Sequence, residues 1–160
     1  MSTNVEVKGN NLIVTRIYAA PIEKVFDAWI ETSKIKEWWG CAECVDVRSE
    51  VEPRLGGAYN HHMTLENEHG RFDVPGFATL VEYDPPHRLA YTSNDENDEM
   101  VITVDFRPVD GGTEVRLVHS RIPDMIVDGE QSMRDVIQAG WTAASQKLGD
   151  FLAGELADAG

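Results

Sequence analysis

Two histidines and a tyrosine are the side chains whose types and spacing best suit chemistry. Tyr59, His61 and Met63 alternate with other residues, as do Leu117 and His119, so each set should share one face of a β-strand. An imidazole has an ordinary pKa near ~6.5, so His61 and His119 would serve as general acid and base if both reached one substrate atom. A core histidine with satisfied hydrogen bonds explains either residue alone. No nucleophile or oxyanion motif accompanies the pair, so catalysis by His61 and His119 is kept as the alternative hypothesis.

The two cysteines, Cys41 and Cys44, have the C-x-x-C spacing that is typical of metal or redox sites. A structural zinc ion needs four ligands, and the others would have to come from His61, His62, His69, Glu43 or a second chain. A redox pair places its thiolate at a helix amino terminus, whereas this pair follows a predicted helix. We therefore predict no metal and no catalytic disulfide, and interpret the pair as two small residues in a turn.

An acidic segment, Asn94 to Glu99, separates two predicted strands. A calcium-binding loop would alternate its ligands around a central glycine and end on a distal glutamate, and this pattern is absent. We interpret the segment as a solvated hairpin tip.

Length and charge exclude several classes of function. A chain of 160 residues with 42% hydrophobic residues can bury a core without disulfides or a structural metal. Its net charge of −14 repels nucleic-acid phosphates and anionic lipids, so we expect neither nucleic acid nor membrane as a partner. The polar first eight residues lack the apolar stretch of a signal peptide. The length predicts a single domain over residues 1–160. The presence of only two cysteines favours a reducing, cytoplasmic location.

Helical periodicity marks two regions that should position these side chains. From Ile22 to Ile30 the apolar residues recur at three- and four-residue spacing, which predicts an amphipathic helix. A shorter helix should follow and end at Gly40. Ser132, with Asp135 three residues later, predicts the start of a long helix that runs to about residue 156 and measures roughly 37 Å.

The remaining segments show the alternation of strands. One strand, residues 12–19, should precede the helices, and six should follow them at residues 44–51, 58–66, 72–83, 88–94, 100–107 and 114–120. Their short connections predict antiparallel neighbours. The expected fold class is therefore α+β, with the order β-α-α-β6-α and a curved antiparallel sheet wrapped around the long C-terminal helix.

Several motifs in this order carry a family resemblance. They are Ala20-Pro21-x-x-x-Val25-Phe26-Asp27-Ala28-Trp29, Trp38-Trp39-Gly40, Gly56-Gly57-Ala58-Tyr59, Glu82-Tyr83-Asp84-Pro85-Pro86-His87-Arg88-Leu89, Asp110-Gly111-Gly112-Thr113-Glu114-Val115 and Gly140-Trp141. From Leu12 to Leu156 the chain resembles the family named after the activator of the heat shock protein 90 ATPase. That family belongs to the START-like or SRPBCC superfamily, whose helix-grip fold is shared with the birch pollen allergen.

The resemblance implies a pocket between the concave face of the sheet and the final helix. Small members of the family are understood mainly as carriers or sensors of apolar ligands, and a few relatives in the superfamily are cyclases, aromatases or hydratases. The co-chaperone that gives the family its name binds the chaperone through a separate amino-terminal module. We see no counterpart of that module in this sequence, so a chaperone interaction is not expected.

Inward-facing strand positions then define the candidate ligand site. We expect a small, mostly apolar or aromatic molecule to bind there without a cofactor; whether the chain forms a homodimer stays open. The candidate ligand-binding residues are Trp39, Tyr59, His61, Met63, Phe106, Leu117, His119 and Trp141. The simpler alternative is that these side chains fill a solid core. Buried polar groups at Tyr59, His61 and His119 favour a pocket, because each would need a hydrogen-bond partner.

Overall fold

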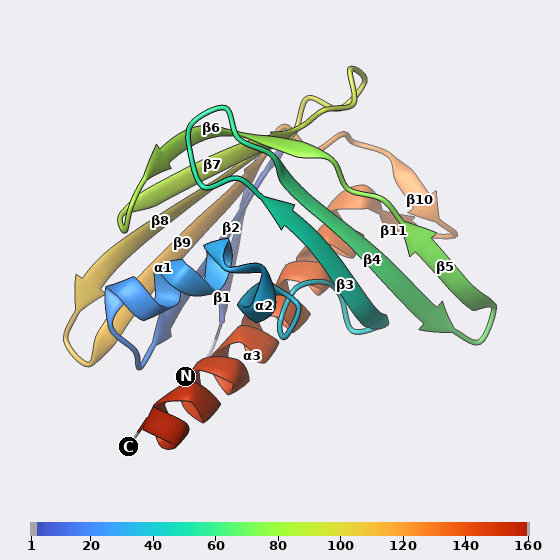
Figure 1. Ribbon diagram of the computed structural model, residues 1–160. Coiled ribbons are helices and arrows are strands. Elements are labelled where there is room, and N and C mark those ends of the chain that lie inside the picture. Colours follow the sequence, from blue (N-terminus) through green and yellow to red (C-terminus); the bar gives the residue numbers. More distant parts are fainter. Residues whose placement is uncertain (1–2, 160) are drawn as a thin grey trace.

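The apolar stripe near the end of the sequence forms a long helix, α3 (Met133–Ala159), which lies in the concave side of a curved antiparallel sheet (Figure 1). This computed structural model describes residues 3–159. Helix α3 begins with the predicted capping box: the Asp135 N–H donates to Ser132 Oγ at 3.1 Å, and the Ser132 N–H donates to Asp135 Oδ2 at 3.4 Å. No helix of the described residues is long and apolar enough to cross a membrane.

The larger section of the sheet is formed by β1 (Asn4–Lys8), β2 (Asn11–Tyr18), β6 (Ala78–Asp84), β7 (Arg88–Ser93), β8 (Val101–Val109) and β9 (Gly112–Ser120). These strands lie in the order β1-β2-β9-β8-β7-β6, and all pairs are antiparallel. The smaller section is formed by β3 (Cys44–Val51), β4 (Tyr59–Asn67) and β5 (Gly70–Val74). An Ala58–Thr79 bridge and the hydrogen bond from the Leu80 N–H to the Gly57 carbonyl join the two sections into one curved surface.

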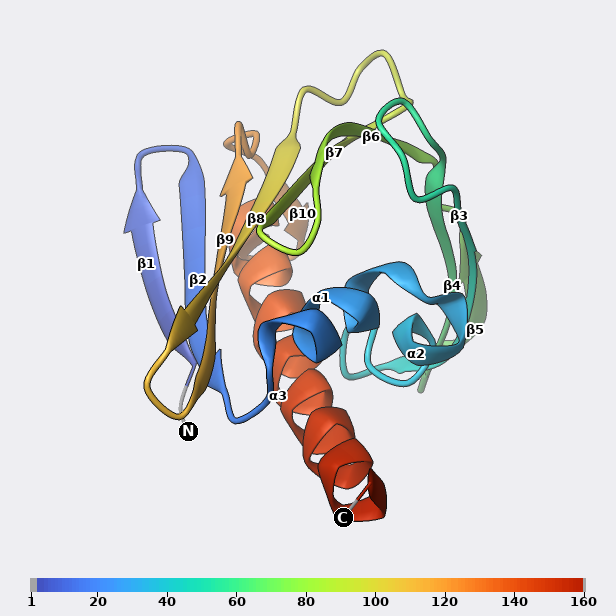
Figure 2. The ribbon, with the colours of Figure 1, turned by 60° about the vertical axis from the view of Figure 1, so that its left-hand side comes forward.

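Two short helices close one end of this surface. They are α1 (Ile22–Ile30) and α2 (Thr32–Ile35), and Figure 2 shows them beside α3, between the two sections of the sheet. The apolar stripe of α1 is buried as predicted, and Trp29 is only 3% exposed. The second helix is shorter than predicted and ends at Ile35. The chain then turns, and the Trp38 indole N–H donates to the Ala28 carbonyl at 2.9 Å.

The helix-grip fold class is confirmed, but the predicted strand order is corrected. The described chain has β1 and β2 before the helices, rather than one strand, and β3 to β11 between α2 and α3, rather than six. Strand β1 was missed because it is an exposed edge strand that alternates poorly. The β10 (Ile126–Asp128) and β11 (Gln131–Ser132) hairpin was missed because these strands are too short to show a period.

The predicted strand over residues 72–83 is broken at Pro75, Gly76 and Phe77, between β5 and β6. Pro75 has no N–H for a ladder. The Gly76 carbonyl accepts from the His61 N–H at 2.9 Å, and a Cβ at Gly76 would stand 2.5 Å from the His61 carbonyl oxygen. This close approach requires glycine, and it fixes the turn of the sheet beside His61.

Candidate functional site

A cavity of about 960 Å³ lies between the first turns of α3 and the concave face of the sheet. This volume falls within the range of small-molecule sites, which is roughly 300–1,000 Å³. Its wall combines aromatic, thioether and aliphatic side chains with a few polar ones. The lining residues are Trp39, Tyr59, His61, Met63, Val74, Pro75, Gly76, Phe77, Ala78, Tyr91, Ser93, Asn94, Asp95, Asp98, Met100, Ile102, His119, Met133 and Ile137.

His61 is the most deeply enclosed imidazole of the wall. Its ring stacks on Trp39 with centroids 4.0 Å apart, and Ser49 Oγ lies 2.8 Å from its Nδ1. The side chain is 5% exposed, and its Nε2 has no hydrogen-bond partner among the residues that the structure describes. Burial, with a smaller contribution from His62, lowers the pKa of His61 to about 3. The ring is therefore neutral at pH 7 and leaves one polar atom unpaired.

His119 is also neutral, but both of its nitrogens have neighbours. The Trp141 indole N–H donates to His119 Nδ1 at 3.0 Å, which places the hydrogen of the neutral ring on Nε2. That Nε2 lies 3.2 Å from the Met100 sulfur. Burial lowers the pKa of His119 to about 4, although the carboxylate of Asp98 acts in the opposite direction.

The aromatic part of the wall is fixed by packing and by one short hydrogen bond. The Tyr59 hydroxyl donates to the Trp29 carbonyl at 2.7 Å, and the rings of Tyr59 and Tyr91 have centroids 4.7 Å apart. Burial raises the phenol pKa of both tyrosines, so both remain neutral. Trp39 lies on the loop after α2, and its ring centroid is 6.0 Å from that of Tyr59. These contacts give the cavity a rigid apolar wall.

Five of the predicted site residues lie on the cavity wall, and three do not. Trp39, Tyr59, His61, Met63 and His119 are brought together there. Phe106 and Leu117 lie outside this wall and belong to the buried core. Phe106 packs against Phe26 with centroids 5.1 Å apart. Trp141 lies behind the wall, where it orients His119 through its indole N–H.

Sequence reasoning missed much of the wall. Ile102 lies on the same face of β8 as the predicted site residue Phe106, and Met100 directly precedes that strand. Alternation identifies this face, but it does not show where along the strand the cavity begins. Met133 and Ile137 also belong to the apolar stripe of α3, from which only Trp141 is a predicted site residue. Tyr91 lies on β7, where no inward face was assigned. The acidic segment interpreted as a solvated tip contributes Asp95 and Asp98.

Cys41 and Cys44 are free thiols just outside the cavity wall. Burial raises the pKa of Cys44, which makes it less reactive at neutral pH. Residues 3–159 contain no group of three or more His, Cys, Asp or Glu side chains placed to hold a metal ion. The loop that carries the pair is positioned by Lys147, whose ammonium donates to the carbonyls of Trp39 and Cys41 at 3.2 and 3.3 Å.

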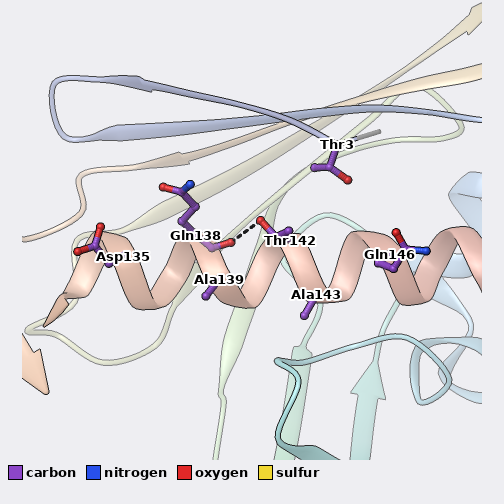
Figure 3. A pocket seen from close by; sticks show the side chains of 7 residues that line it. All are labelled: Thr3, Asp135, Gln138, Ala139, Thr142, Ala143 and Gln146. Carbon is purple, nitrogen blue, oxygen red and sulfur yellow. Dashed lines mark hydrogen bonds between the residues drawn. The ribbon is translucent and has the colours of Figure 1, made fainter. Parts of the chain in front are cut away.

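A second groove lies between Thr3 and one face of α3, as Figure 3 shows. Its side chains are small or polar: Thr3, Asp135, Gln138, Ala139, Thr142, Ala143 and Gln146. The Thr142 hydroxyl is already paired with the Gln138 carbonyl at 2.8 Å. The groove offers no aromatic wall and no imidazole, so the cavity is the better candidate site.

Comparison with known families agrees with this architecture. The family model described as Activator of Hsp90 ATPase homolog 1-like protein matches residues 19–153. The chain belongs to this family. The match covers α1, most of the sheet and most of α3, so it includes every element that lines the cavity. The comparison with curated proteins found no match.

Solved structures show the same fold at low sequence identity. A protein from Rhodobacter sphaeroides is 19% identical, with a TM-score of 0.74 over 96% of this chain and 99% of its own. A Chromobacterium violaceum protein is 21% identical, with a TM-score of 0.74 over 91% of this chain and 98% of its own. A Silicibacter pomeroyi protein is 21% identical, with a TM-score of 0.66 over 91% of this chain and 99% of its own. At these identities the likeness supports the fold of the Hsp90-activator-like family, and not a particular ligand.

Proposed function

We propose that this protein binds a small, mostly apolar molecule in the cavity between the sheet and α3, as a carrier or sensor module. The observation that carries the proposal is the cavity itself, which has a volume of about 960 Å³ and is lined largely by aromatic and thioether side chains. Such walls suit flat or irregular apolar ligands, because methionine side chains adapt their shape and aromatic rings offer large contact areas.

The unpaired Nε2 of His61 supports the same proposal. A buried polar atom without a partner costs about 1–3 kcal/mol. Natural structures satisfy most such atoms, often with water or a ligand. His61 lines the cavity, but Nε2 itself has almost no accessible surface, so a hydroxyl group on a bound molecule would pair with this nitrogen once the neighbouring side chains move aside.

The electrostatics of the two histidines favour binding over acid–base catalysis. A general acid must be protonated near neutral pH, and burial lowers the pKa values of His61 and His119 to about 3 and about 4. The Nδ1 atom of His119 is also occupied by the Trp141 indole N–H. A catalytic role through His61 and His119 therefore receives no support from the geometry.

A dye titration tests the proposal. N-phenyl-1-naphthylamine is a neutral apolar dye whose emission rises in an apolar site, and we expect saturable binding with about one site per chain. Ile137→Trp places an indole into the cavity from α3, whereas Val136→Trp adds the same group on the neighbouring, exposed residue. The first variant should weaken dye binding about tenfold or more, which corresponds to about 1.4 kcal/mol, and the second should leave it unchanged.

Thermal unfolding of both variants provides the control for folding. If Ile137→Trp folds normally and still binds the dye as tightly as the parent protein, the dye lies elsewhere and the proposed site is wrong. Absence of saturable dye binding by the parent protein would also count against the proposal.

A further inference from the structure

The charged groups on the cavity wall have one sign. Within residues 3–159 the lining contains two carboxylates, Asp95 and Asp98, and no lysine or arginine. Neither carboxylate forms an ion pair with a described residue. The chain as a whole has a net charge of −14, which adds to the negative potential at the cavity.

Both carboxylates are fixed by their own loop. Asp95 Oδ1 accepts from the Asn97 N–H at 2.9 Å, and Asp98 Oδ1 accepts from the Met100 N–H at 2.8 Å. The charge of Asp98 reaches the imidazole of His119, whose pKa it raises against the larger effect of burial. Asp95 is exposed and Asp98 is half-buried, so of the two lining carboxylates Asp98 is the better placed to act on a molecule within the cavity.

A second feature of the wall is a buried imidazole that bears no charge. His61 is 5% exposed, lines the cavity, and leaves Nε2 without a partner among the described residues. A neutral imidazole nitrogen pairs with a ligand hydroxyl or amine but cannot balance a negative charge. A ligand carboxylate would lose its hydration here and meet two like charges without a cation.

Building on the proposed function, we infer that the cavity selects its ligand by charge: it accepts an apolar body that carries a protonated amine and rejects the same body with a carboxylate. The two aspartates supply the attraction to the ammonium group, and the aromatic wall supplies the contact with the body. Long-chain and aromatic carboxylic acids are accordingly poor ligands, and apolar amines are the chemical class that fits.

Three naphthalene compounds with one ring system test this preference by titration calorimetry at neutral pH and low salt. They are 2-(1-naphthyl)ethylamine, 2-(1-naphthyl)ethanol and 1-naphthylacetate. We expect the amine to bind at least about tenfold more tightly than the carboxylate, with the alcohol between them. High salt should reduce the difference between amine and carboxylate while leaving the alcohol nearly unchanged.

A pair of matched double variants assigns the effect to the cavity wall. Asp95→Asn with Asp98→Asn removes both lining charges while keeping an amide oxygen for each backbone N–H. Glu96→Gln with Glu99→Gln removes the same charge from the same loop at residues that do not line the cavity. The first variant should reduce the amine-to-carboxylate affinity ratio to within about threefold of unity, and the second should leave most of the ratio in place.

The outcomes separate this inference from the proposed function. If none of the three compounds binds, both are overturned. If all three bind with equal affinity, or if the carboxylate binds most tightly, the cavity binds apolar molecules but does not select them by charge. An equal loss of the ratio in the two double variants would assign the preference to net charge instead of Asp95 and Asp98, and would also overturn the inference.

Discussion

The buried histidines should make the stability of this protein fall steeply in mild acid. In the folded protein the pKa of His61 is lowered to about 3 and that of His119 to about 4, from the ordinary 6.5 expected in the unfolded chain. Below pH 6.5 these two histidines bind protons in the unfolded chain but stay neutral in the folded protein. The stability that these residues contribute is thus complete above about pH 6.5 and is lost as the pH falls toward 4 and 3.

The magnitude follows from the width of that window. One pKa unit corresponds to about 1.4 kcal/mol, so lowering the pH to about 5, which is about 1.5 units below the ordinary value, costs about 2 kcal/mol for each histidine. His61 is 5% exposed and His119 is 7% exposed, so solvent screening reduces these figures little. The expected loss of about 4 kcal/mol is a large part of the 5–15 kcal/mol that is typical of a domain.

Urea unfolding at about pH 8 and about pH 5 measures this loss directly. His61→Phe keeps an aromatic ring against Trp39, and His119→Gln keeps an acceptor for the Trp141 indole N–H. The double variant should lose far less stability between the two pH values than the parent protein. His69→Gln is the control, because the His69 side chain is 76% exposed. Equal pH dependence in the parent protein and the double variant would refute the reasoning.

Four further substitutions test the packing of the fold. Trp29→Ala should lower the free energy of unfolding by about 3–5 kcal/mol, because Trp29 is 3% exposed and packs against Trp38 and Trp141. Phe72→Ala should change the free energy of unfolding by less than about 0.5 kcal/mol, because Phe72 is exposed. Gly76→Ala should cost about 1–3 kcal/mol by forcing a Cβ against the His61 carbonyl. Gly154→Ala, whose new Cβ meets nothing within 4 Å on helix α3, should instead stabilise the protein by up to about 1 kcal/mol. Urea unfolding measures all four, and a Trp29→Ala or Gly76→Ala variant as stable as the parent protein would contradict the packing described here.

Local periodicity was sufficient to predict the elements that carry most of the site. The three- and four-residue spacing of α3 and the capping pair Ser132 and Asp135 were correct, because a helix and its cap depend on neighbours in sequence. The inward faces of β4 and β9 were likewise predicted, and they brought His61 and His119 to the cavity.

Long-range packing decided the rest of the site. Ile102 and Phe106 share one face of β8, yet Ile102 lines the cavity and Phe106 belongs to the core, because Phe106 packs against Phe26 of α1 at the far end of that strand. The break between β5 and β6 depends on the approach of Gly76 to His61, which lies fifteen residues earlier in the chain. Alternation within a strand contains no information about either contact.

Amide chemical shifts of the protein with the neutral dye N-phenyl-1-naphthylamine test the central claim most directly. If the cavity binds apolar molecules, saturating shifts should concentrate on its wall, at Tyr59, His61, Tyr91, Ile102 and Ile137. Shifts confined to the groove between Thr3 and α3, or no saturating shifts at any soluble dye concentration, would contradict the claim.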